Sequence, residues 1–264
     1  CRIFIHNKPY MRPILLICII ALSTSCTLPS CRTISGLETD SQPFTHEQWT
    51  NLLQKHVNAD GWVNYDGFIK DSLQLNNYLQ QIESNYPNEK NWSREQILAY
   101  WINAYNAYTV QIVIRNYPVA SIKDIKPGVA FLNSVWDIKF ITIEGEQLDL
   151  NNIEHTLLRQ MIDPRIHFAV NCASYSCPKL LNTAYEAATI DNQLNQQAID
   201  FINDPKRNVI TAEKADVSSI FNWFTGDFTN DGSLKDFLNK YSKVPIAENT
   251  GINFLEYNWN LNKQ

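Results

Sequence analysis

One segment of 26 residues, SREQILAYWINAYNAYTVQIVIRNYP, constrains the fold of this chain more than any other. It begins at Ser93, and Gln96 follows three residues later, which is the pattern of a capping box at the start of a helix. Pro118 ends the pattern, because proline cannot continue a helix. Apolar side chains project in nearly every direction around the helical repeat, and a helix that is apolar on all sides is buried. We therefore predict a central buried helix over residues 93–116.

Two asparagines interrupt this apolar helix. Asn103 and Asn106 are three residues apart, so they lie on one helix face. A buried amide must find hydrogen-bond partners, because leaving it unpaired costs free energy. Two interpretations are open. In the first, the amides and the neighbouring Tyr100 bind a substrate or orient an imidazole. In the second, the amides bond backbone groups in a crowded core.

Shorter patterns elsewhere alternate between helix and strand. Amphipathic or capped segments predict helices at residues 45–57, 68–84, 151–161, 191–203 and 233–241. Alternating segments predict strands at residues 139–143, 166–170, 208–210 and 217–221, and a final extended segment at 253–261. We find no internal repeat and no second boundary. The predicted fold class is therefore α+β, a helix-rich single domain over residues 44–264, with the central buried helix packed on a small mixed or antiparallel sheet.

The first 43 residues have the pattern of targeting and tethering segments. Residues 14–22 form an unbroken apolar run of nine, the length of a signal-peptide core and too short to span a bilayer. Small residues and then Cys26 follow this run, which resembles a bacterial lipoprotein signal in which that cysteine is lipidated. We predict an upstream extension at residues 1–10, a signal peptide at 11–25 and a polar tether at 26–43.

Two alternatives to lipidation at Cys26 stay open. Leu22 lies four residues before Cys26, whereas the usual leucine of such signals lies three residues before the cysteine. Cys31 has the usual spacing from Leu28, but Pro29 intervenes and the site is farther from the apolar run. The segment could also be a secretory signal that is cleaved without lipidation.

Charge and composition restrict the partners of the chain. The sequence is 44% hydrophobic and 12% aromatic, which is too apolar for a disordered protein. Its net charge is −5, and removal of residues 1–25 takes away three basic residues and leaves −8. We therefore expect no nucleic-acid partner, because phosphate binding needs a basic face. The expected partner is a ligand or protein of the bacterial cell envelope, on its periplasmic or cell-surface side, with the membrane contacted only through the lipid anchor.

The densest group of reactive side chains lies in residues 153–180, IEHTLLRQMIDPRIHFAVNCASYSCPKL. A cysteine nucleophile needs a thiolate, which a nearby imidazole can generate. On this interpretation Cys172 at the end of the predicted strand is the nucleophile, His155 is the base and His167 supports it, with Asn103 or Glu154 as the orienting group. Candidate binding residues are Asn106, Tyr100, Arg159 and Arg165.

Other interpretations of the same residues stay open. In an exported protein Cys172 and Cys177 could form a local disulfide that pins the loop. His155, His167 and the two cysteines could hold zinc, but their spacing matches no common zinc module, and we predict no metal. The chain also lacks a phosphate-binding glycine loop and a nucleotide fingerprint, so we predict no cofactor. Near the C-terminus, Asp227 could orient a histidine or cap a helix, and we favour the structural cap.

Several of these runs together resemble the domain of unknown function 547 family. The similarity extends over about residues 60–240, and the runs YWINAYNAY and HFAVNCASYSCP are the most specific parts. The terminal FLEYNWNLN is also similar, except that Asn258 stands where the family pattern leads us to expect Asp. The resemblance implies a single domain and one site region, and no established activity. The residues at motif positions are Asn103, Asn106, Glu154, His155, Arg159, Arg165, His167, Cys172 and Cys177.

Two functions compete at this point. The favoured one is a non-catalytic binding or structural module of the cell envelope, in which Cys172 and Cys177 close a loop. The alternative is a cysteine-dependent hydrolase or acyltransferase with Cys172 as nucleophile and His155 as base. For either function we expect Cys172, His155, His167 and Asn103 to converge on one pocket, because buried polar groups satisfy one another best in a single network.

Overall fold

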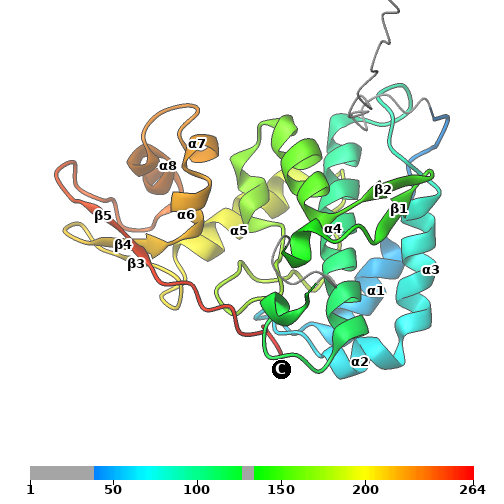
Figure 1. Cartoon of the computed structure of the whole chain (residues 1–264). Helices are drawn as coiled ribbons and strands as arrows, with labels where there is room; N and C mark the ends of the chain where they lie inside the picture. Colours follow the sequence, from blue (N-terminus) through cyan, green and yellow to red (C-terminus); the bar gives the residue numbers. More distant parts are fainter. Residues whose placement is uncertain (1–38, 127–133) are drawn as a thin grey trace, which may run out of the picture. The chain divides into compact units, whose positions relative to one another are not determined.

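Helix α4, Arg94–Asn116, runs through the centre of the computed structural model, which describes residues 39–126 and 134–264 (Figure 1). The capping box is present, since the Ser93 side chain accepts from the Gln96 backbone and the Gln96 side chain accepts from Ser93 N at 2.7 Å. Every residue from Leu98 to Val113 is buried. The predicted central helix is therefore present with its predicted start and end.

Helices surround α4 on several sides. Helices α1 (Glu47–His56), α2 (Tyr65–Lys70) and α3 (Ser72–Glu83) pack together, and α2 and α3 lie against α4. The π-helix η4 (Asn152–Leu158) also packs on α4. The closest packing of α4 is thus against helices, whereas we predicted that it packs on a small sheet.

The second half of the domain has its own apolar cluster. Helices α5 (Ile190–Ile202), α6 (Ile220–Trp223), α7 (Thr225–Phe228) and α8 (Leu234–Tyr241) contribute to it. Phe168, Phe201 and Phe221 are buried at its centre, with ring centroids 5.4–6.2 Å apart. Stacked and tilted aromatic rings therefore join the segment after η4 to the C-terminal helices.

Two small sheets complete the α+β fold. Strands β1 (Ile141–Ile143) and β2 (Glu146–Leu148) form an antiparallel hairpin. Its turn residues Glu144 and Gly145 both have positive φ, as two-residue hairpin turns require. Strands β3 (Val209–Ile210), β4 (Ala215–Ser218) and β5 (Ile252–Leu255) form a mixed sheet, with β4 antiparallel to β3 and parallel to β5 in the register Ala215↔Ile252. The predicted fold class, a helix-rich α+β single domain, is confirmed.

The predicted strand at residues 166–170 is wrong. Residues Pro164–Phe168 form a 3-10 helix, η6, with the Asp163 side chain accepting from Arg165 N at 3.1 Å. Proline at the first position has the φ of a helical turn, and a capping aspartate favours the same start. The predicted helix at 151–161 is present as η4 followed by a 3-10 turn, η5 (Arg159–Met161), and the predicted strand at 217–221 gives way to α6 after Ser218.

Part of the predicted tether is packed on the domain. Thr39 Oγ1 donates to Tyr86 O at 2.8 Å, and Trp92 Nε1 donates to Ser41 O at 3.0 Å. The packed domain therefore already includes residues 39–43. The signal peptide, Cys26 and Cys31 lie outside the described residues. Among the residues that are described, no helix combines the length and the apolar run that crossing a bilayer requires.

Candidate functional site at the cysteine loop

A cavity of about 170 Å³ opens beside the segment that carries both core cysteines. This segment, residues 171–178, is called the cysteine loop below. The cavity lies between the cysteine loop, η4, α6 and the extended chain after β5. Its lining residues include five sequence candidates, Cys172, Cys177, His155, His167 and Glu154.

Aromatic rings form one side of this cavity. We call this group the aromatic wall, and it consists of Trp136, Trp223, Phe224, Tyr257 and Trp259. The tryptophan and tyrosine rings contact one another, with Trp223 stacked on Trp259 at a centroid distance of 5.6 Å and Tyr257 at 4.6 Å from Trp259. Trp223 is 47% exposed, so the wall reaches the protein surface. Such a surface offers flat apolar contact to a ligand.

Asn106 fixes the start of the cysteine loop. Its amide nitrogen donates to Ala169 O at 3.0 Å, and its amide oxygen accepts from Asn171 N at 2.8 Å. The Asn171 side chain then spans the loop, donating to Pro178 O at 2.7 Å and accepting from Ala173 N at 2.9 Å. Two buried amides therefore tie the loop to α4 and tie its two ends together.

The chain after β5 holds the loop from another side. Asn260 O accepts from Tyr175 N at 2.6 Å, and Asn258 O accepts from Ser176 N at 3.2 Å. Ala173, directly after Cys172, has φ +59°, a left-handed conformation that costs a non-glycine residue about 1–2 kcal/mol. These contacts maintain a sharp bend at Cys172.

Both cysteines are free thiols in the structure, and they interact with each other. Cys172 N donates to Cys177 Sγ at 2.8 Å, and the two side chains are also hydrogen-bonded. Cys172 Sγ lies 3.1 Å from Ser174 Oγ and 3.3 Å from Tyr257 OH. Burial alone would raise the pKa of Cys177, but the hydrogen bonds from Cys172 and Tyr257 outweigh it and lower that pKa to about 7. The predicted disulfide is thus absent from this structure, although the two sulfurs are neighbours.

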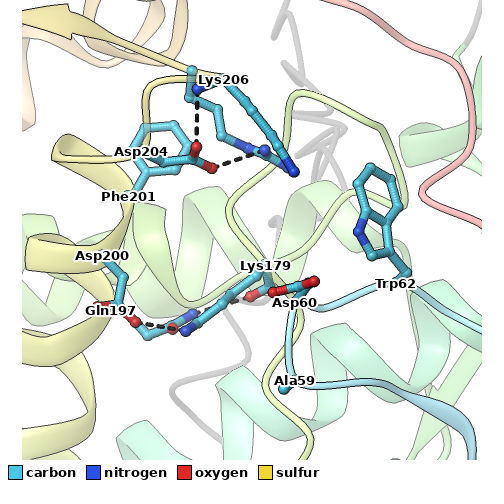
Figure 2. A pocket seen from close by; sticks show the side chains of 10 residues that line it. Ala59, Asp60, Trp62, Lys179, Gln197, Asp200, Phe201, Asp204 and Lys206 are labelled. Atoms are coloured by element: carbon cyan, nitrogen blue, oxygen red, sulfur yellow. Dashed lines mark hydrogen bonds and ion pairs between the residues drawn. The ribbon is translucent and has the colours of Figure 1, made fainter.

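A second cavity, of about 230 Å³, lies beside the cysteine loop and contains paired charges (Figure 2). Lys179 lies 2.5 Å from Asp200, and the Arg207 guanidinium lies 2.8 Å from Asp204. Arg207 also donates to the backbone oxygens of Tyr175 at 2.8 Å and Cys177 at 3.3 Å. These cations already have partners, so we interpret this cavity as a support of the cysteine loop.

Glu154 contributes a buried carboxyl group to the first cavity. It lies in η4, and π-helical turns are often found at functional sites. Burial raises the pKa of Glu154 to about 7, although a hydrogen bond from Tyr105 favours the charged form. A carboxyl with this pKa can take up or release a proton near neutral pH.

We expect the Glu154→Gln variant to reveal this proton. The carboxyl has an ordinary pKa of 4.5 and a folded-state pKa of about 7, so its stabilising contribution is complete below pH 4.5 and is lost as the pH rises through 7. Glutamine is neutral at every pH, so the variant does not lose stability as the pH rises in this way. Between about pH 5 and pH 8, the unfolding free energy of the variant should gain about 2–3 kcal/mol relative to the wild type. Urea denaturation at each pH measures it. The exposed Glu248→Gln should show no such gain, and parallel profiles for wild type and Glu154→Gln would contradict a protonated Glu154.

A histidine, an aspartate and an arginine form a network at the edge of the cavity. His167 Nε2 lies 2.7 Å from Asp227 Oδ2, and the same carboxylate accepts from Arg159 Nε at 2.6 Å and Nη2 at 2.8 Å. The hydrogen bonds from His167 and Arg159 hold the pKa of Asp227 far below its usual range. Burial lowers the pKa of His167, whose ring stacks on Phe224 at 3.9 Å. The structural cap that we favoured for Asp227 is wrong, since its carboxylate orients a histidine.

The contact of His155 argues against its predicted role as a base. Arg159 Nη1 lies 3.0 Å from His155 Nδ1. A guanidinium only donates, so Nδ1 must be the acceptor and the proton of the neutral ring is on Nε2. Burial and the Arg159 charge both lower the pKa of His155. Neither nitrogen of the neutral ring is then free to take a proton from a thiol.

Three other predicted site residues lie away from the cavity. Asn103 bonds the backbone of Tyr185, donating to O at 2.8 Å and accepting from N at 3.0 Å. Tyr100 donates to Ile82 O at 2.8 Å inside the core. Arg165 pairs with Asp163 at 2.7 Å. The predicted convergence therefore holds for Cys172, His155 and His167 but is wrong for Asn103, because that amide bonds the backbone of another loop.

The aromatic wall and Tyr105 were not among the site residues predicted from the sequence. Trp223 lies in the run of residues 219–228, in which only Asp227 was a site candidate, and Tyr257 and Trp259 lie in a segment that was noted for its extended pattern and its family resemblance. Their one available signal was the density of aromatic residues in the last 45 residues of the chain. Within residues 39–126 and 134–264, no three His, Cys, Asp or Glu side chains gather in an arrangement that could hold a metal ion.

Comparisons with known proteins agree with the resemblance seen in the sequence. Residues 89–202 match the family described as "Protein of unknown function, DUF547". The matched part contains Asn106, Glu154, His155, Cys172 and Cys177, whereas much of the aromatic wall lies beyond it. No curated protein and no solved structure matched the chain. The family description assigns no activity.

Proposed function

We propose that this domain is a binding module that takes a small organic ligand into the cavity beside the cysteine loop. The observation that carries the proposal is the pairing of the aromatic wall with a polar floor formed by Glu154, Cys172 and Cys177. Binding sites in proteins combine apolar walls with a few convergent polar groups in this way. A pocket with this lining supports binding without requiring a reaction.

The charges around the cavity define the class of ligand. Arg159 and Asp227 neutralise each other at 2.6 Å, and burial keeps Glu154 largely protonated below pH 7. His155 and His167 both have lowered pKa values, mainly through burial. A strongly charged ligand would thus find no free counter-ion among these groups. We propose an uncharged ligand with a flat or apolar body for the wall and a hydrogen-bonding end for the floor.

A fluorescence titration tests the binding function. The wall contains Trp136, Trp223 and Trp259, so an occupant should change the tryptophan emission. A panel of small aromatic and aliphatic amides, esters and disulfides is titrated into the protein, with native mass spectrometry to count bound molecules. Trp223→Ala should weaken binding of any hit at least about tenfold, which corresponds to about 1.4 kcal/mol.

Phe254→Ala provides the matched control. Phe254 in β5 is 42% exposed, similar to Trp223, and does not line the cavity. It should leave the affinity unchanged. A panel without a single binder, or a hit whose affinity is the same in Trp223→Ala and wild type, would contradict the proposed function.

We also propose that the domain acts in the bacterial cell envelope as a lipoprotein anchored through Cys26. The support is the apolar run at residues 14–22, followed by small residues and this cysteine. Cys26→Ser should move the protein from the membrane fraction to the soluble fraction, whereas Cys31→Ser should leave it in the membrane. Membrane retention of Cys26→Ser would contradict the assignment.

A further inference from the structure

The two core cysteines differ in access to the cavity. Both line the cavity, but Cys172 is half-buried whereas Cys177 is only 4% exposed. Their side chains are hydrogen-bonded to each other, and Cys172 N also donates to Cys177 Sγ at 2.8 Å. One sulfur can thus meet a molecule in the cavity while the other is close enough to attack the first.

The surroundings favour a reactive sulfur over an inert buried one. Tyr257 OH lies 3.3 Å from Cys172 Sγ, Ser174 Oγ lies 3.1 Å from it, and Cys172 N contacts the other sulfur. Burial and the neighbouring Cys177 outweigh the Ser174 and Tyr257 hydrogen bonds and raise the pKa of Cys172 well above its ordinary value, whereas hydrogen bonds lower the pKa of Cys177 to about 7. The thiolate of the resting pair is therefore on Cys177, where it can take the proton of Cys172. The other titratable groups that interact with the pair are the carboxyl of Glu154 and the buried phenols of Tyr65 and Tyr105. Glu154 is the one among them that can accept a proton near neutral pH.

The loop brings the two sulfurs together without help from a covalent bond. Asn106, Asn171 and Arg207 bond its backbone at both ends, and Ala173 holds the bend. The loop therefore has the same supports whether the thiols are free or joined. A purely structural disulfide adds little here, because it would close a loop that hydrogen bonds already close and that contains few residues.

We propose that Cys172 and Cys177 form a redox-active dithiol that reduces a disulfide reaching the cavity. The inference rests on the proposed function only in placing its substrate in the same cavity. The substrate class is a small molecule or an exposed chain segment that contains an S–S bond. Cys172 is the attacking sulfur and Cys177 the resolving sulfur.

The reaction consists of two exchanges. Cys172 gives its proton to the Cys177 thiolate as its sulfur attacks one sulfur of R–S–S–R′, the S–S bond breaks, and R–S⁻ leaves and takes up a proton from solvent. Cys177 then attacks the mixed disulfide between Cys172 and R′ at Cys172 Sγ, and R′–S⁻ leaves with the proton of Cys177. The products are the Cys172–Cys177 disulfide, R–SH and R′–SH, with one proton from the pair and one from solvent. Glu154 can carry these protons between the pair and the leaving sulfurs.

The test uses the full chain with Cys1, Cys18, Cys26 and Cys31 replaced by serine, so that only the pair can react. The reduced protein is mixed with an aromatic disulfide that is uncharged at neutral pH, 4,4′-dithiodipyridine, and the released thiopyridone is followed by absorbance. Two equivalents should be released, and mass spectrometry should find the protein without an adduct and short of two hydrogen atoms. Cys177→Ser should release one equivalent and keep the other half of the reagent on Cys172. Cys172→Ser should react at least about tenfold more slowly than this.

Two outcomes would overturn the proposal. In the first, Cys172 reacts no faster than a simple thiol such as glutathione, or Cys177→Ser and wild type release the same amount. In the second, the purified protein contains a disulfide that glutathione reduces only when the protein is unfolded, which would make the bond a structural staple. Ligand titrations with the Cys172→Ser variant separate this result from the binding function, since uncharged ligands without sulfur should still bind.

The Glu154→Gln variant tests the proton carrier. The Cys177 thiol also has a pKa of about 7, so a step near pH 7 should remain in both proteins, and the readout is the rate above that step. This rate should fall at least about tenfold in Glu154→Gln, while the stoichiometry of two is kept. The rate should be unchanged in the exposed control Glu248→Gln. An unchanged rate in Glu154→Gln would remove Glu154 from the reaction and leave the dithiol assignment to the release experiment above.

Discussion

Replacing Trp101 with alanine should lower the free energy of unfolding by about 3–5 kcal/mol. The ring is 3% exposed in the centre of α4, and it contacts Tyr86 and Tyr100 edge-on at centroid distances of 5.5 Å and 4.7 Å. Removal of a buried indole loses its transfer free energy and leaves a cavity that the surrounding helices cannot fully close. Urea denaturation followed by circular dichroism measures the change.

Trp223→Ala is the comparison for this experiment. Its ring is 47% exposed on the aromatic wall, so its loss should cost less than about 1 kcal/mol of stability. A Trp101→Ala protein that unfolds at the same urea concentration as Trp223→Ala would show that α4 is not the centre of the core. Ligand binding should report the opposite order, since only Trp223 lines the cavity.

The fold was predictable where the sequence pattern is long and has clear ends. Helix α4 has a capping box at Ser93, apolar residues over four helical turns and a proline at 118, and each signal acts locally. The segment at 166–170 is short, so apolar residues at alternate positions could not distinguish a strand from a tight helical turn. Pro164 and Asp163 decide in favour of the turn, and their effect reaches only a few residues along the chain.

The candidate site was predictable only in the part that is contiguous in sequence. Glu154, His155, His167 and Cys172 lie within 19 residues, and the structure places all four around one cavity. The partner of His167 is 60 residues away in α7, and no local pattern connects an aspartate with a distant histidine. The aromatic wall could not be predicted for the same reason, because its residues meet only where the chain after β5 packs against the cysteine loop.

The two asparagines of α4 show that a helical sequence pattern predicts burial but does not predict hydrogen-bond partners. The spacing showed correctly that Asn103 and Asn106 are buried, with exposed fractions of 0% and 2%. It could not show which loops would meet them. Asn103 bonds the backbone of Tyr185, whereas Asn106 bonds Ala169 and Asn171 at the start of the cysteine loop. Each amide makes one donor and one acceptor bond, so the two residues form a matched pair for experiment.

Asn106→Ala and Asn103→Ala should therefore have similar effects on stability and different effects on the thiols. Each variant leaves a buried backbone N–H and a buried C=O without their partner, and such groups cost about 1–3 kcal/mol apiece. We expect each to lower the unfolding free energy by about 2–5 kcal/mol in urea denaturation. Only Asn106→Ala frees the backbone that leads into Cys172, so only this variant should change the rate at which iodoacetamide alkylates Cys172, by about tenfold or more.

The direction of that change follows from the contacts of the sulfur. When the start of the loop is released, Cys172 Sγ moves away from Ser174 and Tyr257, and Cys172 N moves away from Cys177 Sγ. Burial is the largest cause of the raised pKa of Cys172, so greater exposure lowers that pKa by more than the lost Ser174 and Tyr257 hydrogen bonds raise it. Alkylation at neutral pH should therefore be faster than in the wild type, because the thiolate is the nucleophile. Alkylation at about pH 9.5 should be faster as well, because the sulfur is more accessible. Equal rates in Asn103→Ala and Asn106→Ala at both pH values would show that Asn106 supports the core alone and does not position the cysteine loop.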